Sequence, residues 1–289
     1  MIKKGIILAG GKGSRLSPLT KVINKQLLPL YDKPLIFYPL SILMLAGIRD
    51  ILIITNPGEE INFKKILGNG SNFGIKIKYT EQSKPNGLPE AFILGEKFIN
   101  KQNIALILGD NFFYGQGFTN RLKEKTKFNS GATIFTYQVN NPEDYGIVEI
   151  KNNKLLNIRE KPKKTKSNLA ITGLYFFDKN AVNFSKKLQP SKRKELEIVD
   201  LINIYKKKKL LNIIKLGRGS AWLDVGNFED LQNAGNFIQN IEQRQNYKIG
   251  CLEEVALNNG WITKKNLMNR IKFFKNSNYS KYLKDLIKN

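Results

Sequence analysis

Short apolar segments alternate with stretches that carry apolar residues at helical spacing through the first half of the chain. The segments are KGIILAG (4–10), DILIITNP (50–57), IKIKYTEQ (75–82), IALILGDN (104–111) and GATIFTYQV (131–139). Their length and their Gly, Pro or Asn boundaries are typical of buried strands. Strands that alternate with helices predict a doubly wound α/β fold, with a mostly parallel sheet covered on both faces.

Strand-like segments become denser after about residue 145. They are YGIVEI (145–150), LLNIRE (155–160), AITGLYFFD (170–178) and LLNIIKLG (210–217). This density predicts a mixed sheet in the second half rather than a continued simple alternation. A long helical pattern then covers residues 229–245, and the rest of the chain is also helical in character. We therefore expect one large domain over residues 1–245 and a C-terminal helical extension over 246–289 packed on it.

The longest apolar stretch, PLIFYPLSILMLAG (34–47), predicts a buried helix that begins near Pro34 and ends at Gly47. The stretch is too short to span a bilayer and contains two prolines, so we expect no membrane contact. Cys251 is the single cysteine, which excludes an internal disulfide framework. No basic and apolar leader opens the sequence, so a reducing cytoplasm is the expected location.

The chain carries 48 lysines and arginines against 24 acidic residues, a formal net charge of +24. Such a charge raises the question of a nucleic-acid partner. However, lysines are scattered along the chain, and the basic runs at 161–166 and 206–209 lack interleaved aromatic residues for base stacking. We predict solvated surface and no nucleic-acid partner. The absence of histidine excludes a Ser-His-Asp triad, a histidine general base and a histidine-ligated metal.

The first strand-like segment ends in a glycine-rich stretch, LAGGKGSRLSPLT (8–20). Glycines expose backbone N–H groups, and Lys12 and Arg15 add positive charge, so the stretch favours a phosphate-binding loop. The Walker A pattern fails because Ile6 and Gly13 stand at its required glycine and hydroxyl positions. The dinucleotide-binding pattern lacks its third glycine. An ordinary tight turn after a strand is the alternative.

Polar residues follow three of the predicted strands where each strand ends: residues 10–15, residues 82–87, and Asp110 with Asn111. Parallel α/β sheets bind ligands at the carboxyl ends of their strands, so these segments should lie together. An acidic residue beside a phosphate loop is where Mg²⁺ would bridge protein and phosphates. The alternative for Asp110 is a helix N-cap, because DNFFYG could begin a helical turn.

Motifs along the whole chain resemble those of the sugar-nucleotidyltransferases, in particular the members that transfer a thymidylyl group to glucose 1-phosphate. After the glycine-rich stretch, the resemblance continues through residues 24–55. It then covers SNFGIKIKYTEQSKPNGLPEAF (71–92), LILGDNFFYG (106–115), EDYGIVEI (143–150), EKPKKTKSNLAITGLYFFD (160–178), LEIVDLINIY (196–205) and GRGSAWLDVGNFEDL (217–231), and it reaches the tail. The glycine-rich stretch alone is moderately specific, whereas the joint set is highly specific.

The resemblance implies a Rossmann-like nucleotidyltransferase fold and a Mg²⁺-dependent reaction of dTTP with α-D-glucose 1-phosphate. The products are dTDP-glucose and pyrophosphate, in the first step of dTDP-deoxysugar synthesis. A sugar-phosphate oxygen attacks the α-phosphorus in line, so the nucleophile is already ionised and needs no general base. The absence of histidine is compatible with that chemistry. Two alternatives stay open: a uridylyltransferase that uses UTP, and a catalytically silent homologue that binds nucleotide sugars.

The resemblance also implies roles for residues at matching positions. The implied catalytic residues are Arg15, Lys25 and Lys161, which neutralise or hold phosphates. The implied nucleotide-binding residues are Leu8, Gly10, Gly11, Gly13, Gln82, Gly87 and Asp110. The implied sugar-binding residues are Asn111, Tyr145, Gly146, Glu160, Lys161 and Thr172. Asp110 and Asp224 match the paired magnesium ligands. Taken alone, Lys25 and Lys161 could be surface lysines, and Asp224 could cap the following helix.

The tail carries a further expectation. Family members of this length are commonly homotetramers with a second nucleotide-sugar site at a subunit interface, so the resemblance implies a homotetramer and feedback regulation. The segments that match this regulatory site contain Tyr114, Gly115, Arg218, Gly219, Glu253 and Glu254. The alternative for residues 246–289 is packing against the core alone.

Overall fold

Four parallel strands make one half of the central sheet in the computed structural model, which describes residues 1–152 and 154–288. They lie in the order β5 (Lys76–Glu81), β4 (Asp50–Thr55), β1 (Lys4–Ala9) and β6 (Ile104–Leu108). Successive side chains of β1 enter opposite layers, because Ile6 belongs to one hydrophobic cluster and Ile7 to the other. Both faces of this half are therefore covered, as the apolar runs predict.

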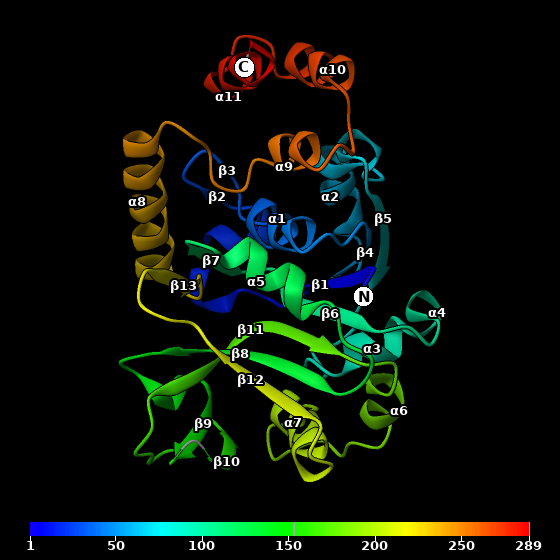
Figure 1. The fold of residues 1–289 in the computed structure, drawn as a ribbon, viewed down its shortest axis with the longest axis vertical. Helices are drawn as coiled ribbons and strands as arrows, with labels where there is room; N and C mark the ends of the chain where they lie inside the picture. Colours follow the sequence, from blue (N-terminus) through cyan, green and yellow to red (C-terminus); the bar gives the residue numbers. More distant parts are fainter. Residues whose placement is uncertain (153, 289) are drawn as a thin grey trace.

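The second half of the sheet is mixed. Strand β11 (Leu169–Phe177) pairs antiparallel with β6, with β8 (Ala132–Gln138) and, at one residue, with β9 (Gly146–Lys151). Strand β12 (Leu211–Lys215) pairs parallel with β8, and β10 (Lys154–Glu160) forms a hairpin with β9. Because β11 alone separates β6 from β8, the strands β5, β4, β1, β6, β8 and β12 run in one direction (Figure 1). The predicted mixed, mostly parallel sheet is confirmed.

Helices cover the two faces of the sheet in separate layers (Figure 1). One layer contains α1 (Phe37–Leu45), α2 (Glu60–Leu67), α5 (Phe118–Lys125) and α9 (Leu252–Asn258). The other contains α3 (Glu90–Leu94), α4 (Glu96–Ile99), α6 (Ala181–Ser185) and α7 (Ile198–Lys207). Fully buried aromatic rings pack beneath them, with Phe63 and Phe73 in the first layer and Phe92 and Tyr205 in the second. The predicted α/β architecture is confirmed.

The path between β1 and α1 differs from the expectation. Helix α1 begins at Phe37 rather than near Pro34, because β3 (Lys33–Pro34) pairs with β2 (Pro29–Leu30) before the helix starts. Single 3₁₀ turns shape this and other connections. They are η1 (Ser14–Leu16), η2 (Leu19–Lys21), η3 (Lys25–Leu27), η4 (Ser71–Phe73) and η5 (Pro142–Asp144).

A two-stranded sheet appears where sequence analysis predicted none. Strand β7 (Asn111–Gly115) pairs antiparallel with β13 (Ser220–Asp224). The segment DNFFYG is therefore extended, and Asp110 is not the cap of a helical turn. Asp224 is not a cap either, because the side chain of Asn227 caps the next helix by accepting from the Asp230 N–H at 2.8 Å.

Four helices end the chain: α8 (Phe228–Gln245), α9, α10 (Lys264–Phe274) and α11 (Asn278–Lys288). The predicted helical tail is confirmed, and α9 packs against α1. Helices α10 and α11 lie beyond α9, at the end of the molecule opposite the β9–β10 hairpin (Figure 1). Residue 245 as a domain boundary stays a prediction.

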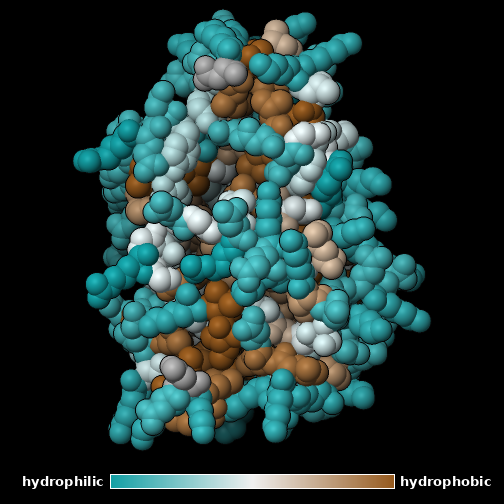
Figure 2. All heavy atoms as spheres, in the orientation of Figure 1, coloured by the Kyte–Doolittle hydropathy of each residue, from teal (hydrophilic) through white to brown (hydrophobic). Residues whose placement is uncertain are grey.

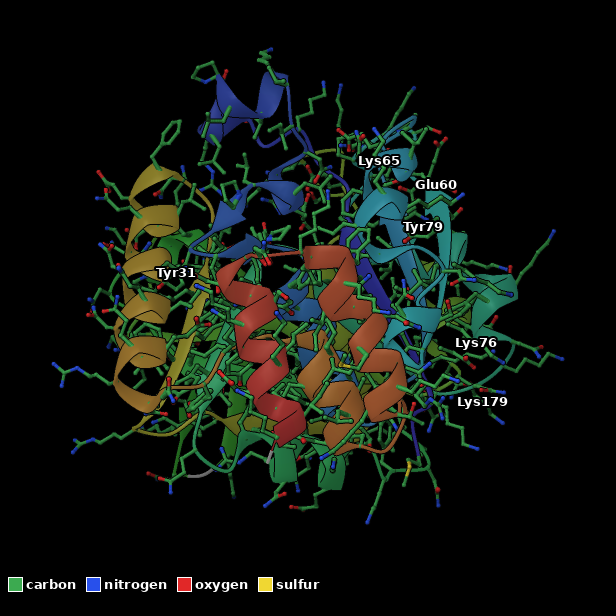
Figure 3. The ribbon with its side chains drawn as sticks, turned by 90° about the horizontal axis from the view of Figure 1, so that it is seen from above. Tyr31, Glu60, Lys65, Lys76, Tyr79 and Lys179 are labelled. Carbon is green, nitrogen blue, oxygen red and sulfur yellow. The ribbon has the colours of Figure 1, made fainter. Side chains whose placement is uncertain are left out.

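Hydrophilic side chains lie around most of the outline of the face seen in Figure 2. Figure 3 shows Lys65, Lys76 and Lys179 directed outward at the rim of the molecule, and all three are exposed. These lysines form the solvated surface that the scattered charge predicts. None of the described helices combines the length and the apolarity that crossing a membrane requires.

Candidate active site

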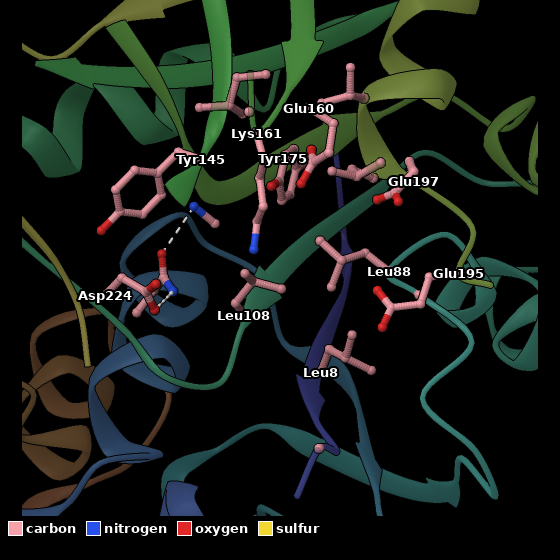
Figure 4. A pocket seen from close by; sticks show the side chains of 18 of the residues that line it. Leu8, Leu88, Leu108, Tyr145, Glu160, Lys161, Tyr175, Glu195, Glu197 and Asp224 are labelled. Atoms are coloured by element: carbon pink, nitrogen blue, oxygen red, sulfur yellow. Dashed lines mark hydrogen bonds between the residues drawn. The ribbon is translucent and has the colours of Figure 1, made fainter. Parts of the chain in front are cut away.

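A cavity of about 330 Å³ opens at the carboxyl ends of the parallel strands (Figure 4). Leu8 at the end of β1, Leu108 at the end of β6 and Gln82 just after β5 line one side of it. A smaller hollow of about 190 Å³ adjoins the cavity, because Gly10 and Gly11 line both spaces. The position at the strand ends is the one that a parallel α/β sheet favours for ligands.

The predicted catalytic, nucleotide-binding, sugar-binding and metal-binding residues all line one of these two spaces. The cavity is lined by Leu8, Gly10, Gly11, Gln82, Gly87, Asn111, Tyr145, Gly146, Glu160, Lys161, Thr172 and Asp224. The hollow adds Gly13, Arg15, Lys25 and Asp110. Residues that are far apart in the sequence therefore meet in one place, and their individual roles stay predictions.

Backbone conformation explains two of the loop glycines. Gly11 and Gly13 have φ angles of 107° and 57°, a region that residues with a side chain rarely adopt. A Cβ at Gly13 would also lie 2.8 Å from Cγ2 of Thr20, whose hydroxyl donates to the Gly13 carbonyl at 2.9 Å. Arg15 follows in η1, and its guanidinium lies against Gly226 across the hollow. The loop thus places a tight backbone turn and a positive charge side by side.

The β7–β13 pair brings the two predicted metal-binding carboxylates together. Asn111 lies opposite Asp224 in the register, and Asp110 directly precedes Asn111. The Asn111 Oδ1 accepts from the Trp222 indole N–H at 2.6 Å and from the Gly173 N–H at 3.0 Å. Its Nδ2 therefore faces the carboxylates, 3.0 Å from Asp110 Oδ1 and 3.4 Å from Asp224 Oδ1. One amide orients both acidic side chains.

The negative charge of this pair is only partly neutralised. Lys25 Nζ lies 2.6 Å from Asp110 Oδ2, and the two side chains are 9% and 21% exposed. Burial, and next the charge of Asp110, raise the pKa of Asp224 to about 7, against the opposing charges of Lys25 and Arg15. Two close carboxylates that share one lysine favour an additional cation.

We expect the metal-free protein to lose stability as the pH rises from about 4 to 7, because of Asp224. Its pKa rises from 3.8 to about 7 on folding, so in this window the folded state holds a proton that the unfolded chain has released. Ionisation of the buried carboxyl then favours the unfolded state. Thermal unfolding should show the wild type losing Tm relative to Asp224→Asn over this window, and excess magnesium should remove the difference. Parallel pH profiles for the two proteins would contradict this expectation.

The opposite side of the cavity combines a lysine, a carboxylate and an aromatic wall. Lys161 enters from the end of β10 (Figure 4), and its backbone N–H donates to the Tyr145 carbonyl at 3.0 Å. The Tyr145 ring packs edge-on against Trp222 with the ring centroids 5.3 Å apart. Burial raises the pKa of the Glu160 carboxyl, and Arg193 Nη2 lies 3.3 Å from its Oε1. These groups suit a phosphorylated sugar.

Two of the predicted sugar-binding side chains use their polar groups within the protein. Asn111 is fully buried and bonded through both amide atoms, as described above. Thr172 is also fully buried, and its hydroxyl donates to the Phe135 carbonyl at 3.0 Å. Both residues therefore shape the cavity wall, and Asn111 also orients the two carboxylates.

A charged loop, SKRKELE (191–197), contributes lining residues to the cavity and was not predicted from the sequence. Arg193 Nη2 lies 2.6 Å from Glu197 Oε2, and both side chains line the cavity. The loop reaches the nucleotide side through a backbone bridge between Gly87 and Leu196. A Cβ at Gly87 would lie 2.1 Å from the Leu196 oxygen, so the bridge requires glycine. In so basic a chain, nothing in the composition of the loop distinguishes it from solvated surface.

The predicted regulatory residues lie apart from the cavity and are only partly grouped. Tyr114, Gly115 and Glu254 line a separate hollow of about 420 Å³. Arg218 and Gly219 are exposed in the turn before β13 and do not line that hollow. Glu253 is fully buried: it accepts from Arg270 Nε at 3.0 Å and from the Tyr279 hydroxyl at 2.6 Å. Its side chain thus joins α9 to the last two helices.

The two spaces together can hold two anions on either side of a cation. Arg15, Lys25 and Asp110 line the hollow, whereas Lys161, Arg193 and Asp224 line the cavity. Among residues 1–152 and 154–288, no cluster of three or more acidic or cysteine ligands could hold a metal alone. A divalent cation at Asp110 and Asp224 would therefore take further ligands from bound phosphates and water.

The chain is similar to known proteins in both sequence and fold. Residues 4–241 match the family model described as nucleotidyl transferase. Glucose-1-phosphate thymidylyltransferase of Neisseria meningitidis serogroup A is 52% identical, over 99% of this chain and 99% of that protein. A Bacillus anthracis crystal structure, provisionally named a glucose-1-phosphate thymidylyltransferase, has a TM-score of 0.75 and 39% identity, covering 81% of this chain and 94% of its own. UDP-glucose pyrophosphorylase complexed with UDP-glucose gives a TM-score of 0.72 at 25% identity, covering 83% of this chain and 99% of its own.

Proposed function

Because the chain belongs to the nucleotidyl transferase family, we propose that it transfers the thymidylyl group of dTTP to α-D-glucose 1-phosphate. The products are dTDP-glucose and pyrophosphate, and the reaction would supply dTDP-deoxysugar synthesis. The observation that carries the proposal is the joined cavity and hollow. A glycine-rich loop with Arg15 lies on one side of Asp110 and Asp224, and Lys161 lies on the other.

Charge neutralisation and placement account for the proposed catalysis. Arg15 and Lys25 would neutralise the triphosphate and the departing pyrophosphate, and Lys161 would hold the sugar phosphate. The bond from the sugar-phosphate oxygen to the α-phosphorus forms as the bond to pyrophosphate breaks, and no proton has to move. Two anions that repel each other are thereby held together, which is the main work of such a site.

We infer that Mg²⁺ is the cofactor and that Asp110 and Asp224 would hold it. Hard carboxylate oxygens are the ligands that Mg²⁺ prefers, and the raised pKa of Asp224 marks negative charge that Lys25 neutralises only in part. When bound, the ion would reduce the charge on the attacked phosphate. The inference depends on the carboxylate oxygens of Asp110 and Asp224, because a lysine ammonium group cannot bind a cation.

A pyrophosphate-release assay tests the function directly. Four nucleoside triphosphates should be crossed with several sugar 1-phosphates, with and without magnesium. We expect release with dTTP and glucose 1-phosphate, and only when a divalent cation is present. A clear preference for UTP would support the uridylyltransferase alternative. The structural similarity to UDP-glucose pyrophosphorylase is the reason to test UTP. Binding without turnover for every pair would indicate the silent homologue.

Gln82 is expected to select the base. Its Nε2 donates to Glu90 Oε2 at 2.5 Å, so its Oε1 is directed toward Gly10 and is available to a pyrimidine N–H. Gln82→Ala should reduce discrimination against purine triphosphates by about 1–3 kcal/mol, measured as ratios of kcat/KM. Asn86→Ala is the matched control, because Asn86 also donates to Glu90, at 2.7 Å, but does not line the cavity. Unchanged ratios in Gln82→Ala would remove this residue from the base site.

We also propose a homotetramer in which residues 246–289 contribute to subunit contacts and to a regulatory site. The separate hollow at Tyr114 and Glu254 supports a second ligand site. Arg218 lies outside this hollow, and in the assembled tetramer it would face the diphosphate of the inhibitor. Light scattering at micromolar concentration should give the mass of a tetramer, and a monomer would contradict the proposal. Inhibition by a dTDP-deoxysugar should weaken in Arg218→Ala while uninhibited turnover stays similar.

A further inference from the structure

A single side chain holds both polar groups of Gly11. The Gly11 N–H donates to Asn56 Oδ1 at 2.9 Å, and Asn56 Nδ2 donates to the Gly11 carbonyl at 3.1 Å. Asn56 reaches the loop because β1 and β4 are parallel neighbours, with Ala9 opposite Thr55 at their ends. An ideal Cβ on Gly11 would meet nothing within 4 Å, so packing does not hold this residue. Asn56 therefore fixes the middle of the glycine-rich loop.

Glu59 connects this contact to the segment that carries Lys25. Asn56 Nδ2 also donates to Glu59 Oε2 at 2.8 Å, and the Nδ2 of Asn24 donates to the same carboxylate oxygen. Asn24 is buried, and its Oδ1 caps η3 by accepting from the Gln26 N–H at 2.8 Å. Lys25 is the first residue of η3. One carboxylate thus joins the glycine-rich loop, the end of β4 and the start of η3.

The surroundings of Glu59 distinguish it from an ordinary surface carboxylate. Glu59 has no ion-pair partner among the described residues, whereas the next residue, Glu60, pairs with Lys64 on the same helix. Its hydrogen bonds come from side-chain amides, which a carboxylate binds strongly. Glu59 therefore orders the chain around the site without neutralising Arg15 or Lys25.

We propose that Asn24, Asn56 and Glu59 form a clamp that positions the glycine-rich loop against Lys25 before the triphosphate binds. The proposal rests on the proposed function, because it takes the loop and Lys25 as the triphosphate site. The clamp commits the Gly11 N–H to Asn56, so backbone contacts to phosphate come from other N–H groups of the loop. Ordering a loop in advance removes a cost of binding, so the clamp acts on the triphosphate rather than on the sugar phosphate.

Two variants test the clamp in the full-length protein. Asn56→Ala and Glu59→Gln are expected to raise the KM for dTTP by about tenfold and to leave the KM for glucose 1-phosphate within about twofold. The double variant should resemble Asn56→Ala, because both residues act through one contact. Hydrogen exchange of the Gly11 amide, followed by NMR without substrate, should accelerate in both variants. Glu60→Gln is the matched control and should behave as the wild type.

Several outcomes would overturn the proposal. One is an unchanged KM for dTTP with unchanged exchange at Gly11. Another is an equal loss for both substrates that tracks a lower Tm, since Asn56 would then only stabilise the fold. If Asn56→Ala does not fold, Glu59→Gln and Asn24→Ala carry the same test. If the wild type releases no pyrophosphate from any triphosphate, the proposed function fails, while Gly11 exchange still decides whether the loop is clamped.

Discussion

Replacing Asp224 with asparagine is expected to lower turnover by about 10²–10⁴-fold while changing the affinity for dTTP by less than about threefold. Asparagine keeps the shape of the side chain but removes a charge that is buried beside Asp110. That charge matters most during transfer, because negative charge on the phosphates is redistributed as pyrophosphate leaves. Asp110→Asn should have an effect of the same order. Steady-state pyrophosphate release and calorimetric titration with dTTP measure the two quantities separately.

Asp200→Asn is the matched control for both variants. Asp200 lies on α7 outside the cavity, and it should keep wild-type turnover. Magnesium titration adds a second readout, because loss of one carboxylate ligand should raise the magnesium concentration needed for half-maximal rate. Near-normal turnover in both aspartate variants, at the same magnesium concentration as the wild type, would show that the carboxylates do not hold the ion.

Lys161→Ala is expected to lower kcat/KM for glucose 1-phosphate by about 10²-fold, mainly through KM. No other lysine is found among the described residues that line the cavity. Removing Lys161 therefore removes the proposed ion pair between its ammonium group and the sugar phosphate. The KM for dTTP should stay close to the wild-type value, since the hollow with Arg15 and Lys25 is unchanged. Initial rates with each substrate varied in turn measure both constants.

Lys163→Ala provides the control in the same basic run. Lys163 is exposed and does not line the cavity, so the variant loses the same formal charge without losing the contact. A similar loss in both variants would mean that net positive charge, rather than Lys161 itself, attracts the sugar phosphate. A raised KM for dTTP in Lys161→Ala would assign the residue to the other substrate.

The central-sheet strands in the first half of the chain could be predicted because each is marked by a short apolar run in its own sequence. Each apolar run from KGIILAG to GATIFTYQV contains a strand of the sheet, since short runs with turn residues at both ends leave few alternatives. Strands β7 and β13 were not predicted, because each is short and owes its extended form to a partner far away in the sequence. Helix α1 begins late for the same kind of reason, as Lys33 and Pro34 pair with an earlier segment.

The site was predictable where a residue type has a recognisable setting. Gly11 and Gly13 follow β1, and Asp110 follows β6, so position and chemistry agree. Arg193 gave no such signal, because its place at the cavity depends on Glu160, which comes from β10 and meets the loop only in the folded chain. The contacts of Asn24, Asn56 and Glu59 with one another and with Gly11 were not predicted from the sequence either. Asn56 and Glu59 share one turn after β4, and their contacts with Gly11 and Asn24 form only when the chain folds.

If Asp224 is needed for turnover, as we propose, the chain can act only after β13 has been made and has paired with β7. Asn111 and Asp224 face each other across the sheet although 113 residues separate them in the chain. A nascent chain that has emerged only to Gly217 already contains the glycine-rich loop and Asp110, but it has no second carboxylate. Fragments from interrupted translation should therefore remain catalytically inert, and activity should begin only once the last strand of the core has folded onto its partner.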